Sequence, residues 1–537
     1  DSASYRTYVK TLKFEFPDSR ISKRLPIGQE EILKKTDQKQ LKAFYDTWYR
    51  PDNMILVVVG DFDTELAGKI IEDKFSTMAP RAPPGTNPVL GDIKHKGIKP
   101  FYHFEKESGN TTVSIEILKK ILSMPDSYDV RKKEFIEDIA NRMVNYRLEA
   151  IIQKPETPFT SASISSGIFL RQIKYADITA DCNPEHWEKS LSLIEQTLRQ
   201  ALIFGFTTSE LERVKKDILS ELDNAVKRSS TRNSRKLARE IIWSLNSNRV
   251  FMSPQQKKKL YTPIIKTVTL KIVHEAFKDI WAPEHRLLVV TGNVKLTDKN
   301  PETIISNTYH KSIQTAVSKP VEEKSVVFPY LPEPKKEGRI IRTKKIPDLE
   351  IIQVDFKNGV RLNIKKTAFK ANQVLVNLAF GRGKSSEPLN KPGLALLTQS
   401  VINESGLGML TKDELERATA GKNTSATFSI DEDGFLFKGN SVSNEVTLLF
   451  QLLYAHIVDP GFRKDAYELS LKRYRQKYMA LSRSIDGAMA LSGRRFLAGG
   501  DQRFGLPDDE AFKKLSLDDI KSWISPFIGN NDIEISV

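Results

Sequence analysis

Residues 44–61 read FYDTWYRPDNMILVVVGD, and a closely related string, FKDIWAPEHRLLVVTGN, occupies residues 277–293. In both strings Trp follows Phe by four residues, and Gly follows Pro by nine residues. A third, degenerate copy reads IKSWISP at residues 520–526 and IEISV at residues 533–537. The chain therefore contains an internal repeat, and this repeat decides the expected fold.

Each copy predicts an amphipathic helix that ends at a proline and leads into a strand. Phe44 and Trp48 lie one helical turn apart, so both are expected on one buried face. Ser516 and Asp519 form a capping box at the start of the third copy. A β-branched strand, Met54–Val59 in the first copy, follows the proline and is closed by a glycine turn.

The length of the repeat indicates a duplicated domain. Trp48, Trp281 and Trp523 are separated by 233 and 242 residues. A unit of about 235 residues is too long for a solenoid repeat, whose period is 20–50 residues.

Hairpins followed by helices recur within the units. Residues 159–182 are predicted as two alternating strands around Ser165-Ser166-Gly167, and the next helix should bury Trp187, Leu191, Ile194 and Leu198. Residues 425–430 and 435–439 flank Glu432-Asp433-Gly434, a hairpin signal, and a helix over 446–457 follows. This order predicts an α+β fold of repeated homologous domains, each a mostly antiparallel sheet with helices packed on one face.

The repeat also divides the chain. Residues 1–80 are expected to be the C-terminal remnant of a first domain, 81–316 a second domain, 317–349 a linker, and 350–537 a third domain truncated at its last strand. Five prolines among Lys and Glu predict an extended, semi-rigid linker. Two Thr-x-x-Glu-Leu-Glu-Arg strings, at 207–213 and 411–417, are 204 residues apart, so they are interpreted as independent capping boxes.

The composition narrows the class of protein. The chain of 537 residues carries a net charge of +15, but its basic residues are scattered and not interleaved with aromatics, so we expect no nucleic-acid partner. No apolar run approaches 18 residues, so no membrane span is expected. The single cysteine, Cys182, excludes an internal disulfide and cysteine-based zinc or iron–sulfur sites.

Several strings together resemble the insulinase/pitrilysin family of zinc peptidases, the inverzincins. They are Arg24-Leu-Pro-Ile-Gly28, the repeat at 44–61, Phe204-Gly-Phe-Thr207 with Glu210-Leu211, and Asn358-Gly359-Val360, which looks like the opening strand of a family domain. The resemblance covers nearly the whole chain, and the first string is most similar to bacterial members with four domains on one chain.

The resemblance implies a clamshell of two halves, each built from two homologous domains. Such a clamshell encloses an unstructured peptide and adds it, main chain to main chain, to an edge strand. The resemblance also implies a zinc ion held by the two His of an H-x-x-E-H helix and by a distant Glu. The Glu within that motif is the general base for zinc-bound water.

The histidines of this chain do not supply that motif. No two are spaced by four among His95, His103, His186, His274, His285, His310 and His456. His274-Glu275 is followed by Lys278 where a second His would be needed, and His103 has no partner, so both are interpreted as structural.

The third domain carries a degenerate copy of the family's active string, Gly-Leu-Ala-His-x-x-Glu-His. Residues 393–400 read GLALLTQS, which places Leu396, Gln399 and Ser400 at the three catalytic positions. None of these side chains can usefully ligate zinc or act as a base at neutral pH. We therefore expect no catalytic and no metal-binding residue in this chain, and its substrate-binding residues are unknown.

The spacing from Leu396 to Trp523, counted back from Trp48, places the intact motif about 80 residues before Asp1. The resemblance implies that the third zinc ligand follows that motif at a distance that puts it near residue 1, just upstream. Glu15 would be that ligand only if the count shifted by many residues, and Phe14-Glu15-Phe16-Pro17 predicts a poor helix. A fourth domain is expected after Val537. The chain thus resembles a fragment of a longer protein.

These observations predict part of a zinc-dependent metalloendopeptidase that degrades or processes unstructured peptides. This stretch would supply scaffold and chamber wall, with zinc bound by the full-length protein and none by this chain. The alternative is a non-catalytic structural or partner subunit of the same family. The expected partners are the peptide substrate, the missing first-domain segment and the fourth domain, with a homo- or heterodimer left open. Family analogy favours the bacterial periplasm, with the cytoplasm as the other option.

Overall fold

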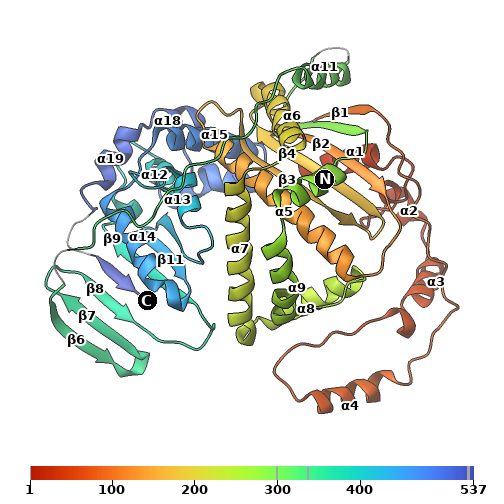
Figure 1. Cartoon of the computed structure of the whole chain (residues 1–537), viewed down its shortest axis with the longest axis horizontal. Coiled ribbons are helices and arrows are strands. Elements are labelled where there is room, and N and C mark those ends of the chain that lie inside the picture. Colours follow the sequence, from red (N-terminus) through yellow and green to blue (C-terminus); the bar gives the residue numbers. More distant parts are fainter. Residues whose placement is uncertain (1, 298–299, 335–337, 529–532) are drawn as a thin grey trace.

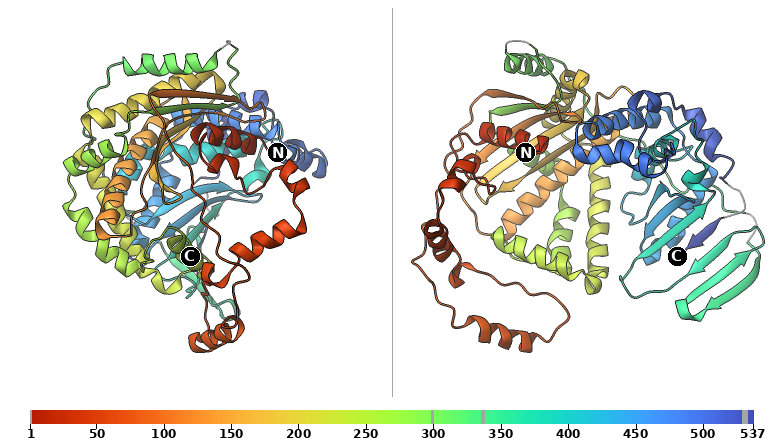
Figure 2. Two further views of the ribbon diagram at one scale, coloured as in Figure 1. Left: turned by 90° about the vertical axis from the view of Figure 1, so that its right-hand side faces the viewer. Right: turned by 180° about the vertical axis from the view of Figure 1, so that it is seen from behind.

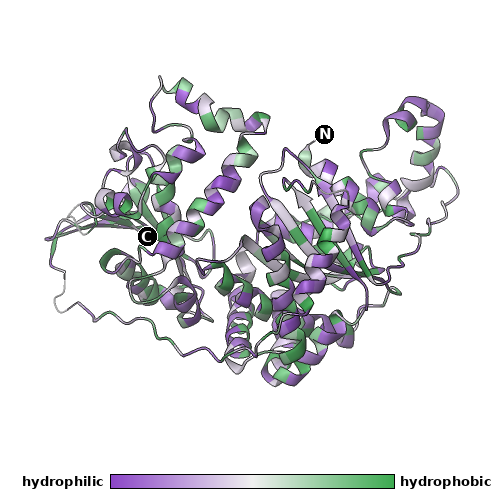
Figure 3. Ribbon diagram, turned by 90° about the horizontal axis from the view of Figure 1, so that it is seen from above, coloured by the Kyte–Doolittle hydropathy of each residue, from purple (hydrophilic) through white to green (hydrophobic). Residues whose placement is uncertain are grey.

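The computed structural model describes residues 2–297, 300–334, 338–528 and 533–537, so residues 335–337 of the expected linker lie outside it. Figure 1 shows two units side by side, each a sheet covered by helices, with an N-terminal segment that extends away from them. We call residues 2–93 the N-terminal segment, 98–313 the middle unit and 340–537 the C-terminal unit. Helices in Figure 3 carry both hydrophobic and hydrophilic residues, as amphipathic helices do.

The N-terminal segment is helical and has no strand among its described residues. Its elements are α1 (Ala3–Glu15), η1 (Ile21–Lys23), α2 (Glu30–Lys35), α3 (Gln38–Trp48), η2 (Pro51–Asn53) and α4 (Thr64–Phe75). Helix α1 is docked on the middle unit, where Leu12 is buried and the Arg6 guanidinium donates twice to the Glu105 carboxylate at 2.9 Å. Residues 16–25 and 90–93 also pack against this unit. Helices α2, α3 and α4 bury no residue, and Figure 2 shows this stretch swinging away from the middle unit.

The middle unit is a five-stranded sheet with helices on one face. Its strands are β1 (Ile98–Phe104), β2 (Thr111–Lys120), β3 (Phe159–Phe169), β4 (Ile173–Cys182) and β5 (Arg286–Gly292). Its helices are α5 (Tyr128–Ile152), η3 (Pro184–His186), α6 (Trp187–Phe204), α7 (Thr208–Lys227), η4 (Ser229–Thr231), α8 (Ser234–Asn246), α9 (Pro254–Thr267), α10 (Leu270–Ile280) and α11 (Pro301–Ile313).

The C-terminal unit repeats this plan and adds a hairpin. Its strands are β6 (Ile340–Ile346), β7 (Ile351–Phe356), β8 (Arg361–Ile364), β9 (Val374–Phe380), β10 (Ser425–Ile430), β11 (Phe435–Ser441) and β12 (Glu534–Ser536). Its helices are η5 (Pro347–Leu349), η6 (Gly383–Ser386), α12 (Leu394–Ser405), α13 (Lys412–Ala418), η7 (Ser443–Glu445), α14 (Val446–Val458), α15 (Lys464–Leu481), α16 (Ile485–Ala488), the π-helical η8 (Met489–Gly493), α17 (Arg494–Leu497), α18 (Asp509–Lys513) and α19 (Leu517–Ile524).

The two sheets have the same topology, which confirms repeated α+β units. The middle sheet runs β1-β5-β2-β4-β3, and the C-terminal sheet contains the matching order β8-β12-β9-β11-β10, extended past β8 by β7 and β6. In each sheet the strand of the repeat, β5 or β12, lies between one parallel and one antiparallel neighbour. All other pairs are antiparallel, as the sequence predicted.

The faces of the middle sheet follow the alternation of its strands. Ile115 and Ile117 of β2 enter the main core under the helices, together with Trp187, Leu191, Ile194 and Leu198 of α6. Leu118 points to the opposite face, where it packs against Leu12 and Phe16 around α1. The predicted buried face of α6 is therefore confirmed, and α1 partly covers the second face.

The three copies of the repeat differ in burial. Phe277 and Trp281 are 0% and 2% exposed, and Ile520 and Trp523 are buried in the same way. Phe44 is 59% exposed, so the expected buried face of the first copy is wrong for the chain as described. Residues 54–59 are extended without forming a strand, because no described strand pairs with them.

Other expectations need correction. The β3–β4 turn lies at Leu170 and Arg171, both at positive φ, instead of at Ser165–Gly167. Arg171 Nε donates to the Asn246 carbonyl of α8, which holds this turn, while Gly167 stays in the strand with the Tyr175 ring packed over it. Asn358 and Gly359 form the β7–β8 turn ahead of the strand, and β6 lies inside the stretch 317–349 expected as linker.

The described residues form many helices, and a bilayer sets a minimum length and hydropathy for any helix that crosses it. None of these helices is both long and apolar enough to cross a membrane.

The repeat supplies a matched pair of substitutions. Phe277→Ala should lower the free energy of unfolding by about 3–5 kcal/mol because it empties a packed core site. Phe44→Ala, at the same position of the first copy, should cost less than about 0.5 kcal/mol because the ring is exposed. Urea unfolding of the two variants measures both values. An equal cost for Phe44→Ala would mean that this ring is buried in solution.

Candidate functional site

The helix that carries the degenerate string is α12, which follows β9, the strand equivalent to β2 of the middle unit. Gly393 precedes it at φ 90°, where a Cβ atom would lie 2.7 Å from the Pro507 ring. The buried Glu387 carboxylate accepts from the N–H of Ala395 at 2.9 Å and so satisfies a free donor of the first turn. Burial raises the pKa of Glu387. The glycine and the leading residues of the string thus have a structural use.

The three positions of the catalytic motif are engaged in internal contacts. Leu396 packs against the core of the C-terminal unit. Gln399 Oε1 accepts from the N–H of Ile430 at 3.0 Å, and the Ser400 hydroxyl lies 2.7 Å from the Ser470 hydroxyl of α15. An apolar side chain, an amide and a hydroxyl do not fit a zinc ion, which takes His nitrogen, Cys sulfur or carboxylate oxygen.

The carboxyl group of Glu15 forms no described ion pair or hydrogen bond with a histidine; its carbonyl oxygen lies 2.8 Å from His95 Nε2. Glu15 is the last residue of α1, so the prediction of a poor helix around it is wrong: the helix includes Phe14 and ends one residue before Phe16. The Phe14 ring stacks on Phe101 of β1 at 4.8 Å, which holds this last turn on the sheet. Glu15 therefore faces the open side of the middle sheet.

Glu15 belongs to a group of three carboxyls with Glu116 of β2 and Asp177 of β4, which are directly paired in the sheet. Burial, with the charge of Glu116 as the next cause, raises the pKa of Glu15 well above its ordinary value of 4.5. Burial also raises the pKa of Glu116 and of Asp177. A protonated Glu15 donating to Glu116 holds α1 on the sheet.

Three of the histidines bond to the backbone through their side chains. His274 Nε2 lies 2.9 Å from the Leu202 carbonyl, and His95 Nε2 lies 2.8 Å from the Glu15 carbonyl. His285 Nε2 accepts from the N–H of Leu118 at 3.0 Å, and burial lowers the pKa of His285 to about 4. His103 Nε2 is 4.0 Å from the Glu105 carboxylate. Over the described ranges, no three His, Cys, Asp or Glu residues are grouped to hold a metal ion.

A hollow of about 1680 Å³ opens in the middle unit between the sheet end, α5 and α8. Its wall includes His95 and His285, and an ion pair joins Lys174 to Glu137 at 2.6 Å. The rings of the two histidines are 5.5 Å apart, but both histidines bond to backbone as described. Among the described residues that line it, neither Ser166 nor Ser247 is hydrogen-bonded to a histidine or a carboxylate.

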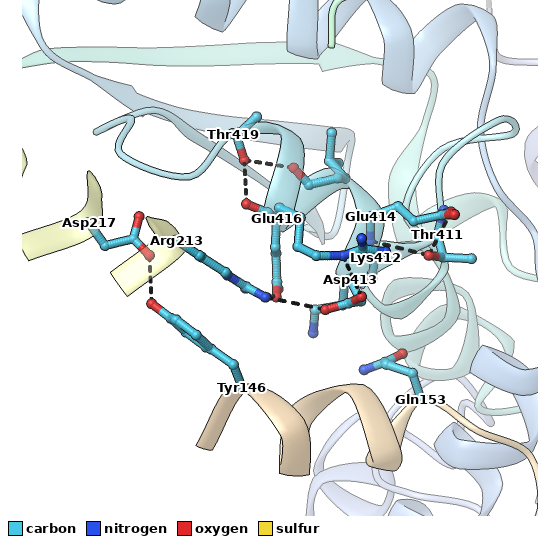
Figure 4. Close-up of polar contacts among 12 residues, drawn as sticks. Tyr146, Gln153, Arg213, Asp217, Thr411, Lys412, Asp413, Glu414, Glu416 and Thr419 are labelled. Carbon is cyan, nitrogen blue, oxygen red and sulfur yellow. Dashed lines mark hydrogen bonds and ion pairs between the residues drawn. The ribbon is translucent and has the colours of Figure 1, made fainter. Parts of the chain in front are cut away.

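The junction between the two units is polar and is built from the two Thr-x-x-Glu-Leu-Glu-Arg strings (Figure 4). Arg213 of α7 lies 3.8 Å over the Tyr146 ring and reaches Asp413 and Glu416 of α13 at 3.4 and 3.5 Å. Each string caps its own helix, α7 or α13, as predicted, but the two capped helices also meet. Sequence reasoning found the strings and missed that they contact each other, because spacing along the chain does not reveal such a contact.

The two units contribute equivalent elements to this junction. Helix α7 contacts the residues before β10, where Gly421 N–H donates to Asp217 at 2.6 Å and the Asn224 side chain bonds Asn423 at 2.9 Å. Helix α15, which follows α14 as α7 follows α6, contacts the start of β3, where Thr160 donates to Gln476 at 2.7 Å. Each unit thus offers the equivalent helix to the equivalent edge strand of the other, as in an isologous interface.

Two residues of the expected linker, Glu322 and Glu323, bond to the two sides of this junction. The Glu322 carboxylate accepts from the N–H groups of Thr208 and Ser209 at the start of α7, at 2.7 and 3.1 Å. Glu323 pairs with Arg417 of α13 at 3.3 Å. Residues 322 and 323 therefore tie the start of this stretch to both units.

The carboxyl group of Glu15 predicts a pH-dependent stability. A pKa raised in the folded state adds stability below the unfolded value of 4.5, and this stability is lost as the pH rises through the folded value. Glu15→Gln should therefore raise stability at pH 8 by about 1–3 kcal/mol and flatten its pH dependence. Thermal unfolding between about pH 5 and pH 9 measures this.

Glu107→Gln is the control, because Glu107 also contacts α1, through Arg6, but is exposed. It should change stability by less than about 1 kcal/mol at every pH. A Glu15→Gln variant with the wild-type pH dependence would contradict the buried carboxyl contact.

Known proteins are similar to this chain in sequence. A family model described as "Peptidase M16 inactive domain" matches residues 35–218. The chloroplastic stromal processing peptidase of Arabidopsis thaliana is 22% identical over 636 residues, covering 100% of this chain and 50% of that protein. The probable zinc protease PqqL of Escherichia coli is 22% identical over 466 residues, covering 85% of this chain and 49% of that protein. The chain spans about half the length of the curated relatives it matches.

Solved structures share the fold over the whole chain. The ferredoxin protease FusC, in a mutant form complexed with Arabidopsis ferredoxin, matches with a TM-score of 0.64 at 19% identity, covering 100% of this chain and 59% of that chain. The periplasmic protease PqqL from Escherichia coli matches with a TM-score of 0.54 at 18% identity and the same coverage. The family match over residues 35–218, the related sequences and the shared fold all make this chain similar to the insulinase/pitrilysin (M16) peptidases.

Proposed function

We propose that this chain forms scaffold and chamber wall of a zinc-dependent metalloendopeptidase whose metal site lies outside these residues. The proposal rests on the contacts that the side chains of α12 make at the motif positions. Leu396, Gln399 and Ser400 fill the positions of the catalytic motif and are used in packing and backbone hydrogen bonds. The relatives named as zinc proteases and processing peptidases support the activity of the whole protein.

The first copy of the repeat leaves its apolar strand-like residues exposed. This exposure supports the proposal that a catalytic-type unit packs against them. Ile55 and Leu56 are 70% and 59% exposed, whereas Leu287 and Leu288 at the same positions of the second copy are fully buried. We assign residues 1–80 to the end of a first domain, 81–316 to a second, 317–349 to the linker and 350–537 to a third. Residues 54–60 would then insert between a parallel and an antiparallel strand of the first domain.

The substrate we propose is an unstructured polypeptide. The complex of FusC with ferredoxin is a protease of this fold with a protein bound, which supports a polypeptide ligand for this chain's whole protein. For its location we propose the bacterial periplasm. PqqL is described as periplasmic, which supports that choice, while other relatives are chloroplastic.

A second candidate is a non-catalytic structural or partner subunit of the same family. The description of the matching family model as an inactive domain favours it. The two candidates differ only in residues outside this chain, so zinc content and hydrolysis by the whole encoded protein separate them.

The first test uses the 537-residue chain alone. We expect it to bind less than about 0.1 zinc per chain and to show no chelator-sensitive hydrolysis of an unstructured peptide, because no described residues form a zinc site. Elemental analysis and a fluorogenic peptide assay measure the two properties. Hydrolysis that a chelator stops would sink the proposal that the metal site lies elsewhere.

The second test uses the whole encoded protein. Leu56→Asp should abolish zinc binding and peptide hydrolysis there by disrupting the first domain, yet leave the stability of the 537-residue chain within about 0.5 kcal/mol. Ile485→Asp is the control, because Ile485 is 94% exposed and lies outside the repeat. Full zinc content in the Leu56→Asp protein would contradict the assignment of residues 54–60 to the catalytic unit.

A further inference from the structure

Strands β3 and β10 occupy equivalent outer positions in the two sheets. On an outer antiparallel strand, every second residue points its N–H and C=O away from the sheet. Such groups form a template to which another polypeptide strand can add. Proteins therefore pair, cover or block such groups. Outward groups of β3 and β10 are bound by side chains of a neighbouring helix in each unit.

In the middle unit, the side chain of Asn145 on α5 meets the outer edge of β3. Its Oδ1 accepts from the N–H of Ile164 at 2.9 Å, and its Nδ2 donates to the C=O of the same residue at 3.0 Å. Ile164 is 2% exposed, so both backbone groups would lack water as well as a strand partner without this amide.

In the C-terminal unit, Asn403 on α12 makes the same two bonds to β10. Its Oδ1 accepts from the N–H of Phe428 at 2.8 Å, and its Nδ2 donates to the C=O of Phe428 at 2.8 Å. One turn earlier on α12, Gln399 accepts from the N–H of Ile430, the next outward residue of β10. Two amide side chains thus bind three consecutive outward groups of this edge.

The two arrangements correspond position by position. Asn145 is preceded four residues earlier by Asn141, as Asn403 is by Gln399. Asn141 Nδ2 donates to the Ser166 hydroxyl at 2.8 Å, and Ser166 follows Ile164 as Ile430 follows Phe428. A side-chain amide carries one donor group and one acceptor, like a peptide group, so it reproduces the pair of bonds that a neighbouring strand would make.

We propose that α5 and α12 take the place of an outer strand in their sheets, and that Asn145 and Asn403 close β3 and β10 against addition of an extended peptide. Gln399 then has a role of its own, as the second closing residue on β10. The closure is a property of the two sheets and is independent of any catalytic role of the whole protein.

The test is amide hydrogen exchange of the full chain, resolved to single residues by fragmentation in the mass spectrometer. Asn403→Leu should speed exchange at Phe428 by about tenfold or more and leave Ile430 unchanged. Gln399→Leu should do the reverse. Thr398→Val, on the same helix and with a buried hydroxyl that lacks a partner in the described structure, should change neither.

Asn145→Leu should speed exchange at Ile164 in the same way and leave β10 unaffected. Equal acceleration of all β10 amides by Asn403→Leu, or no acceleration at Phe428, would overturn the proposal, since the amide would then only stabilise the unit as a whole. A third arm adds an excess of an unstructured glycine–serine–threonine–valine peptide to the wild-type chain. Exchange at residues 162–166 and 425–430 should not change, and new protection there would show that the edges are open.

Discussion

The structure depends on one arrangement: a strand preceded by a Trp-bearing helix and inserted between a parallel and an antiparallel neighbour. A central strand needs partners on both sides, because each of its backbone groups must form a hydrogen bond once it is buried. In the middle unit β5 meets this need with β1 and β2, and Leu288 and Val290 are fully buried. In the C-terminal unit β12 meets it with β8 and β9. The same sequence pattern at residues 44–61 has the helix, but no described strand pairs with it, and most of its apolar side chains stay exposed.

The helix that follows β2 in the middle unit and β9 in the C-terminal unit shows how one position in a repeated fold can serve different ends. In the family's active string this helix carries metal ligands and a base. In α12 the corresponding side chains pack on the core, bond the edge strand and join α15. The equivalent helix α5 of the middle unit bonds its own edge strand through Asn145. Both units of this chain therefore use the helix for closure of the sheet, which agrees with a role as scaffold.

Much of the fold could be predicted from sequence because it follows local periodicity. The α6 face, the β10–β11 hairpin and the capping boxes at Thr207, Thr411 and Ser516 are set by residues close in the chain. The β3–β4 turn could not be placed, because Leu170 and Arg171 adopt positive φ only with Arg171 anchored on the distant α8. The degenerate motif was located from its string alone, whereas the contacts of Gln399 and Arg213 depend on tertiary packing.

The most direct measurement compares amide hydrogen exchange at residues 54–59 and 286–292 of the same chain. The two segments occupy equivalent positions in the repeat, and described strands flank only the second of them. The account predicts exchange at residues 54–59 near the rate of an unfolded peptide, with strong protection at 286–292. Comparable protection in both segments would contradict it, since the first copy would then already have its sheet partners within this chain.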